Sequence, residues 1–429
     1  MTSDPVASSR GRLLRGTLFI AVAMGVMNLS TYGFTMLAAR LLGPREYGAI
    51  AAVMGVLLVV SVVSLGLQAT GARRVSAAPG ALAGIEADVF AASLRAALTL
   101  GVLCLLAVPV VTVVLRLESW LTAVLIAVTA VPMTLMGGQA GILQGERRWL
   151  SLASVYLAVG LGRIVLGTAG LLVRPDTLGG MVGVTLGAVL PAVVGWAALR
   201  HPGRRADATR TAEAVAGTSV RRGPGGVFRE VAGNSHAMLA FFALSNADVL
   251  IARSVLDDQQ GGLYAGGLIL AKAVLFLPQF VVVIAFPSMS EAGSRRRVHG
   301  KGFALVLGIG GIATLGAWTL SGLAVTFVGG AAYADLEPTI AVFAAVGTVL
   351  ALVQLMVYGV VARQDQRSVL VLWAGLLAVL ASAAFVDSVG ALLTVVVVVE
   401  SVVLTVLLAI SLRRRLPQQD QATSQEATV

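Results

Sequence analysis

The stretch Leu37–Ile50, "LAARLLGPREYGAI", has a counterpart in the second half of the chain, Leu250–Ile269, "LIARSVLDDQQGGLYAGGLI". In both stretches an apolar run ends in Ala-Arg, and a short turn rich in Gly, Pro or acidic residues follows. A tyrosine then opens the next apolar run. The repeat predicts that the chain is built from two related halves.

The composition indicates that lipid, not water, surrounds most of the chain. Of 429 residues, 57% are apolar and 12% are charged, and the mean hydropathy is +0.91. Soluble domains carry about 25% charged residues. The single cysteine, Cys104, excludes an intrachain disulfide and a cysteine-ligated metal cluster. Because His201, His236 and His299 are too scattered for metal-ligand spacing, we expect no metal and no other cofactor.

Apolar windows of about 20 residues predict about twelve membrane-spanning helices. Pro109, Pro132, Pro191 and Pro278 lie inside these windows, and packed membrane helices tolerate such kinks. The sequence therefore predicts an all-α integral membrane protein. The expected spans are 14–39, 48–69, 94–115, 120–143, 149–173, 178–199, 231–255, 263–287, 303–328, 339–361, 369–386 and 389–411.

The distribution of basic residues predicts how these spans are oriented. With the N-terminus inside, most of the 31 Lys and Arg residues, including Arg95, fall in cytoplasmic segments. Lys and Arg concentrate in the cytoplasmic loops of membrane proteins, so we expect both termini to be cytoplasmic. The residues left for the outer loops are Arg40, Arg45, Arg116, Arg174 and Arg253.

A basic segment separates two sets of six spans. Residues 200–230 carry seven arginines among Gly, Pro, Ala and Thr, which is typical of a flexible linker. Because six is even, the second set enters the membrane in the same sense as the first, so the halves are parallel repeats. We predict an N-terminal bundle over 1–199, a cytoplasmic linker over 200–230, a C-terminal bundle over 231–412 and a cytoplasmic tail over 413–429. Such halves form rocking transporters with a binding site between them.

Polar residues at helical spacing mark one face of three predicted spans. These faces are candidates for the lining of a central cavity. The alternative is that Ser, Thr and Asn side chains hydrogen-bond neighbouring helices and hold them together. The residues are Asn28, Thr31, Tyr32 and Thr35 in the first span, Ser61, Ser64 and Gln68 in the second, and Asn234, Ser245 and Asp248 in the seventh.

Four ionisable residues lie deep inside predicted spans, where each costs about 2.5–3.5 kcal/mol. We expect Arg163, Asp248 and Lys272 to bind substrate, with Asp248 also a candidate for ion coupling. For Glu400, in the last span, a structural role is favoured. Asp248 and Lys272 lie at similar depths in consecutive spans, so they can neutralise each other in an empty site. A permanent ion pair that only joins two helices is the alternative.

Three stretches carry a family resemblance: "NADVLIARSVL" (246–256), "GLYAGGLILAKAVLFLPQFVVVIAFPSMS" (262–290) and "ILQGERRWLSLASVYLAVGLGRIVLG" (142–167). With the Ala-Arg turns, they resemble the polysaccharide exporter, or oligosaccharide flippase, branch of the multidrug/oligosaccharidyl-lipid/polysaccharide (MOP) exporter superfamily. The resemblance implies a MATE-like fold of two six-helix bundles around a central cavity. It also implies that a polyprenyl-pyrophosphate-linked oligosaccharide, or a similar cell-surface glycan precursor, is flipped across a bacterial plasma membrane by alternating access.

Three functions compete. Arg163 and Lys272 suit a pyrophosphate and favour the glycan flippase over a cation-coupled multidrug exporter of the same superfamily, which would need a negatively charged cavity. A membrane-embedded glycan polymerase or glycosyltransferase would need a large outer loop, and no predicted outer loop exceeds about ten residues. "GIGGIA" at 308–313 lies within a span, and no Gly-Lys-Ser/Thr phosphate loop is present, so we expect no enzyme activity. Expected partners are membrane lipids and the lipid-linked glycan, with glycan-assembly enzymes as further candidates and no nucleic acid.

Overall fold

The computed structural model describes residues 5–78, 81–200, 224–289, 295–363 and 366–413. The predicted tail and most of the predicted linker lie outside these ranges, as do the side chains of several helix ends, among them that of Asn234.

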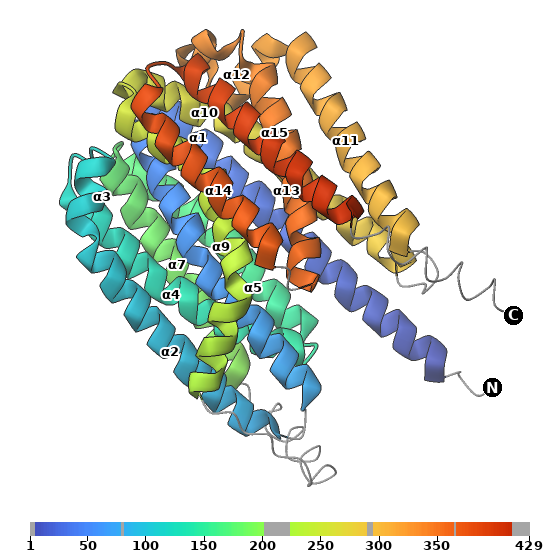
Figure 1. Cartoon of the computed structure of the whole chain (residues 1–429). Helices are drawn as coiled ribbons and strands as arrows, with labels where there is room; N and C mark the ends of the chain where they lie inside the picture. The colour runs from blue at the N-terminus through green and yellow to red at the C-terminus, as the bar shows by residue number, and fades with distance from the viewer. Residues whose placement is uncertain (1–4, 79–80, 201–223, 290–294, 364–365, 414–429) are drawn as a thin grey trace, which may run out of the picture.

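The described residues form helices, and no strand occurs among them (Figure 1). The first half comprises α1 (Pro5–Ala77), α2 (Leu82–Leu106), α3 (Val108–Val114), α4 (Trp120–Gly145), α5 (Trp149–Leu161), η2 (Gly162–Leu166), α6 (Gly167–Val173) and α7 (Thr177–Arg200). The second half comprises α9 (Pro224–Val255), α10 (Asp258–Met289), α11 (Arg295–Thr319), α12 (Ser321–Val328), η3 (Gly330–Leu336), α13 (Ile340–Arg363), α14 (Gln366–Ser382), η4 (Ala383–Phe385) and α15 (Val389–Arg413).

Helix α1 contains the first two predicted spans, joined at Gly43. The backbone there has φ 69° and ψ 174°, a conformation that is essentially restricted to glycine. Ile20 packs against a cluster of buried residues that includes Leu143, and Ser76 Oγ donates a hydrogen bond to the carbonyl of Gly145, so the two ends of α1 lie at the same end of the bundle. The chain therefore reverses at Gly43, and we call the end of the bundle that contains this turn the Gly43 end.

The described helices agree with an all-α membrane protein. Ten helical stretches among the described residues are long and apolar enough to cross a membrane. The first of them, 59 residues long, contains the reversal at Gly43. Helix α10 is not among the ten, although its 32 residues are also long enough to cross a bilayer. With the first stretch divided at Gly43 and α10 added, these helices fit the twelve predicted spans.

The third predicted span begins earlier than hydropathy indicated. Helix α2 starts at Leu82 rather than near residue 94, and it ends at Leu106, just before Pro109 in the first turn of α3. Its first turns contain polar residues, so an apolar window does not detect them. A helix can nevertheless extend beyond the lipid and include such residues. Arg95, which the predicted boundaries place in a cytoplasmic segment, is an exposed residue within α2.

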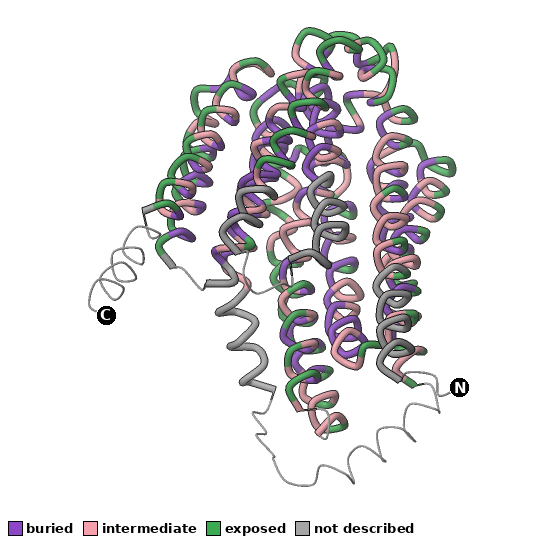
Figure 2. The backbone as a smooth tube through the Cα atoms, turned by 90° about the vertical axis from the view of Figure 1, so that its right-hand side faces the viewer, coloured by how far each residue is buried: buried purple, intermediate pink, exposed green. Residues whose placement is uncertain are grey.

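Burial follows the contacts between helices (Figure 2). Many large apolar side chains are exposed, including those of Leu29, Val113 and Val173, as expected for faces in contact with lipid tails. The largest group of buried apolar residues includes members of both halves, such as Phe34 and Phe343. In the contact between the halves, α1 packs against α9 and α10.

Candidate functional site

Asp248 is the most enclosed of the predicted site residues that carry a charge. It lies on α9 with 2% of its surface exposed. Its Oδ2 accepts a hydrogen bond of 3.1 Å from the hydroxyl of Tyr264 on α10, and its Oδ1 accepts one of 2.8 Å from the backbone amide of Val249. A buried carboxylate needs such donors to replace water. Tyr264 is the residue that opens the apolar run after the second repeated turn.

Lys272 does not pair directly with Asp248. Its Nζ donates a hydrogen bond of 2.8 Å to Oδ1 of Asn246, a residue of α9 that was not among the predicted site residues. The Asn246 amide in turn donates to the carbonyl of Phe242 at 2.8 Å. The Lys272 charge still acts on Asp248, because the two groups are close enough for an electrostatic interaction. The expected direct contact is therefore replaced by an arrangement in which Asn246 holds the lysine beside the acid.

Glu400 brings a second carboxylate to this group. It lies on α15 with 2% of its surface exposed, and its Oε2 has no hydrogen-bond partner among the described residues. Asp248 and Tyr264 are close enough to interact with it electrostatically. No sequence pattern links Glu400 to the repeated turn, because α15 is far from α9 along the chain. We call Asp248, Tyr264, Lys272, Asn246 and Glu400 the acidic cluster.

Arg163 lies in the other half of the protein, in a π-helical turn that interrupts the fifth predicted span. Single π-helical turns occur often at functional sites. Leu161 and Val165, two residues before and after it, are 50% and 58% exposed. Positions two apart project to nearly opposite sides of a helix, so Arg163 points away from the exposed face and into the bundle. It makes no hydrogen bond or ion pair with the part of the chain that the structure describes.

The predicted polar face of the second span contacts other helices of the first half. Ser64 Oγ donates to the carbonyl of Met133 at 2.7 Å. Gln68 Nε2 donates to Oε1 of Gln144 at 2.9 Å and to the hydroxyl of Tyr156 at 2.7 Å. These bonds join α1 to α4 and α5. For Ser64 and Gln68 they fit the alternative in which polar side chains hold neighbouring helices together.

The remaining predicted residues make local contacts or are only partly buried. Thr35, Ser61 and Ser245 hydrogen-bond backbone carbonyls of their own helices, at Thr31, Leu58 and Phe242. Asn28, Thr31 and Tyr32 are partly buried on α1. The structure thus joins Asp248, Lys272 and Ser245 in one region of α9 and α10 and places Arg163 in the opposite half.

Glu146 is a titratable group outside the spans, and we expect it to make stability depend on pH. Burial raises the pKa of its carboxyl from 4.5 to about 7, although Arg148, 3.8 Å away, acts in the opposite sense. Between pH 4.5 and 7 the unfolded chain loses this proton while the folded protein keeps it, so stability should fall as pH rises through this window. Thermal unfolding in detergent at pH 5 and pH 8 measures the change. Glu146→Gln should reduce the change in stability between the two pH values, and the exposed control Glu118→Gln should not. The same pH dependence in both variants would contradict the assignment of this effect to Glu146.

Comparisons with known proteins identify the fold. No model of a known protein family matches the sequence, and no curated protein matches it. Solved structures do match over nearly the whole chain. An inward-facing multidrug resistance MATE family transporter of the MOP superfamily is 11% identical, with a TM-score of 0.64, over 93% of this chain and 97% of that one. An outward-facing structure of such a transporter is 14% identical, with a TM-score of 0.61, over 94% and 95%.

A third similar structure is a MOP superfamily transporter from Pyrococcus furiosus, described as having a binding pocket of reversed polarity that suggests a different function. It is 12% identical, with a TM-score of 0.58, over 94% of this chain and 95% of that one. All three proteins are transporters rather than enzymes. In the described residues, no group of His, Cys, Asp and Glu is arranged to hold a metal ion. The chain therefore has the fold of the MATE transporters of the MOP superfamily.

Proposed function

We propose that the protein is a transporter that flips a polyprenyl-pyrophosphate-linked oligosaccharide, or a similar anionic glycan precursor, across the plasma membrane by alternating access. The observation that carries this proposal is Arg163, whose guanidinium points into the bundle from the middle of a span and pairs with none of the described residues. A charge inside a membrane is costly, and the ionisable residues found there usually have a function. A guanidinium binds phosphate oxygens through two parallel hydrogen bonds, which suits a pyrophosphate headgroup.

The membrane potential can drive this transport outward. A negative charge that leaves an inside-negative cytoplasm gains about 2.3 kcal/mol per 100 mV. The similar structure from Pyrococcus furiosus, whose reversed pocket polarity suggests a different function, supports the view that pocket polarity varies within this fold. With both termini cytoplasmic, as the basic residues predict, the Gly43 end faces outward.

A cation-coupled multidrug exporter is the second candidate. The acidic cluster favours it, because Asp248 and Glu400 are buried carboxylates that could bind a proton. The fold is shared with multidrug transporters, which also supports this reading. The two candidates differ in the charges that bind the substrate: the cations Arg163 and Lys272 for an anionic lipid, or the carboxylates of Asp248 and Glu400 for a cationic drug.

Arg163 should decide between them in a flipping assay. We expect purified protein in liposomes to move a fluorescent polyprenyl-pyrophosphate-linked sugar to the outer leaflet, where an impermeant quencher reaches it. Arg163→Leu should slow flipping by about tenfold, the scale of one lost charge-assisted hydrogen bond, and Arg163→Lys should retain part of the rate. Arg95→Leu, which removes an exposed arginine from α2, is the matched control and should flip normally.

Transport of a lipophilic cationic dye by the same liposomes tests the second candidate. Movement of the dye but not of the lipid would replace the flippase proposal with the exporter. A normal rate of lipid flipping in folded Arg163→Leu would show that this residue is not part of the substrate site.

A further inference from the structure

The two repeated turns meet at the Gly43 end of the bundle. A Cβ atom added to Gly48 would lie 3.0 Å from the Cα of Gly262, so the two backbones are in direct contact. The ring of Tyr47, which follows the first turn, packs edge-on against Tyr333 of the second half at 6.4 Å between centroids. The repeat therefore brings equivalent segments of the two halves together.

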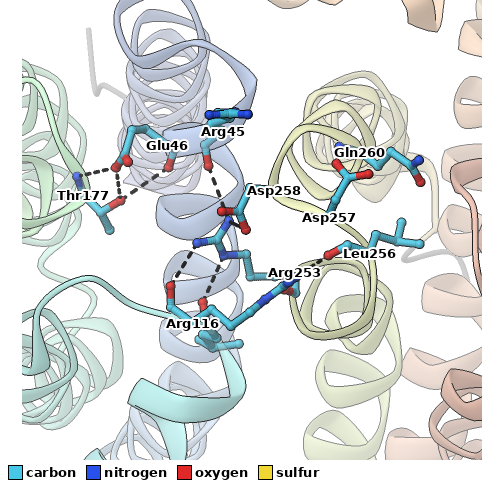
Figure 3. Close-up of polar contacts among 10 residues, drawn as sticks. Arg45, Glu46, Arg116, Thr177, Arg253, Leu256, Asp257, Asp258 and Gln260 are labelled. Atoms are coloured by element: carbon cyan, nitrogen blue, oxygen red, sulfur yellow. Dashed lines mark hydrogen bonds and ion pairs between the residues drawn. The ribbon is translucent and has the colours of Figure 1, made fainter.

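Arg253, the arginine of the second Ala-Arg turn, reaches into the first half (Figure 3). Its Nε donates to the carbonyl of Leu115 at 2.9 Å, and its guanidinium also donates to the carbonyl of Arg116 at 3.0 Å. Both carbonyls follow directly after α3, where a helix leaves backbone acceptors without partners. The guanidinium also donates a charge-assisted hydrogen bond of 2.8 Å to Oδ1 of Asp258, which holds it in place, and only 5% of Arg253 is exposed.

Arg116 makes the reciprocal contact. Its guanidinium donates to the carbonyls of Arg253 and Leu256, at the C-terminal end of α9, and its Nε is 3.0 Å from the Arg253 carbonyl. The backbone of Arg116 has φ 46°, in the left-handed region that non-glycine residues seldom adopt. Each arginine thus caps the end of a helix in the opposite half, and cations at helix C-termini are favoured by the helix dipole.

The first Ala-Arg turn makes the corresponding contact in the other direction. Arg40 donates to the carbonyl of Thr326 at 2.8 Å, near the end of α12 in the second half. The hydroxyl of Tyr333 donates to the carbonyl of Ala39, next to Arg40, at 3.3 Å. Each Ala-Arg turn therefore binds the C-terminal end of a short helix that closes the third span of the opposite half.

We propose that Arg40, Arg116 and Arg253 form a reciprocal clasp that keeps the Gly43 end closed and must release for that end to open. The proposal rests on the proposed alternating access, since a transporter has to open each end in turn. Most acceptors in the clasp are helix-terminal carbonyls rather than acids. These carbonyls and guanidinium groups can bond to water once the end opens, so the clasp can release without leaving buried charges unpaired.

The separation of the two halves at this end tests the clasp without any substrate. Spin labels at Glu118 in the first half and Asp335 in the second, both exposed, report the distance on a background that lacks Cys104, the single cysteine. We expect Arg253→Gln to enlarge the population with the longer distance by about tenfold, the scale of one lost charge-assisted hydrogen bond. Arg40→Gln, with a single exposed bond, should give a smaller increase of about threefold.

Arg45→Gln is the matched control. Arg45 lies in the same turn and carries the same charge, but its guanidinium makes no hydrogen bond with the described residues, because Arg253 uses only its backbone carbonyl. The control should leave the distances unchanged. An unchanged distribution in folded Arg253→Gln and folded Arg40→Gln would overturn the clasp, and if Arg253→Gln fails to fold, Arg40→Gln decides alone. The distance measurement needs no substrate, so it tests the clasp separately from the proposed function. If the open population rises in a protein that flips no lipid, the clasp is supported and only the proposed substrate is contradicted.

Discussion

A Gly262→Ala variant should be destabilised by about 3 kcal/mol or more, the upper range for overpacking a filled interior. The added Cβ would lie 1.7 Å from the carbonyl oxygen of Pro44, which is backbone and cannot rotate away as a side chain could. Relief requires α1 and α10 to move apart where the two repeated turns meet. The amount of monodisperse protein after detergent extraction and its unfolding temperature measure the effect.

Gly311→Ala and Gly316→Ala are matched controls within α11. A Cβ atom at either position would meet nothing within 4 Å, so the change only removes a flexible residue from a helix. These variants should be neutral or gain up to about 1 kcal/mol. An unfolding temperature for Gly262→Ala equal to those of the two controls would show that the turns are not packed as tightly as described.

Removing the charge of either Asp248 or Lys272 should slow transport by about a hundredfold, which corresponds to an increase of roughly 2.7 kcal/mol in the activation free energy. In our proposal the substrate phosphate binds Lys272, and a proton or cation then occupies Asp248, which changes the state of the transporter. Lys272 binds Asn246 at 2.8 Å and not Asp248, so no direct ion pair has to break when the lysine binds a ligand. Glu400 supplies a second carboxylate for the same proton or cation.

Asp248→Asn, Lys272→Gln and the double variant distinguish coupling from a structural role. If the charges couple binding to a change of state, the double variant should be folded but inactive in the flipping assay. If they only neutralise each other, each single variant should fold poorly and the double variant should recover normal flipping. Glu400→Gln should also lose activity, whereas Asp335→Asn, an exposed acid of the same half, should not.

The sequence alone determined the helical membrane architecture. Lipid cannot hydrogen-bond a backbone, so each crossing requires about 20 apolar residues in a helix, and such runs are visible in a single sequence. The repeated Ala-Arg turns also predicted two related halves, and the structure shows these turns in contact with one another. The boundaries were less accurate where helices extend beyond the apolar windows, as α2 does from Leu82.

Only the tertiary structure decided which polar groups meet. Helical spacing gives Ser64 and Gln68 a common face but does not name the neighbouring helix, and they bond to Met133, Gln144 and Tyr156 of their own half. Glu400 joins Asp248 because α15 belongs to the same bundle as α9 and α10, a proximity that no local pattern records. The acceptors of Arg40, Arg116 and Arg253 are mainly backbone carbonyls, which every residue carries, so no residue type in the sequence could have identified them.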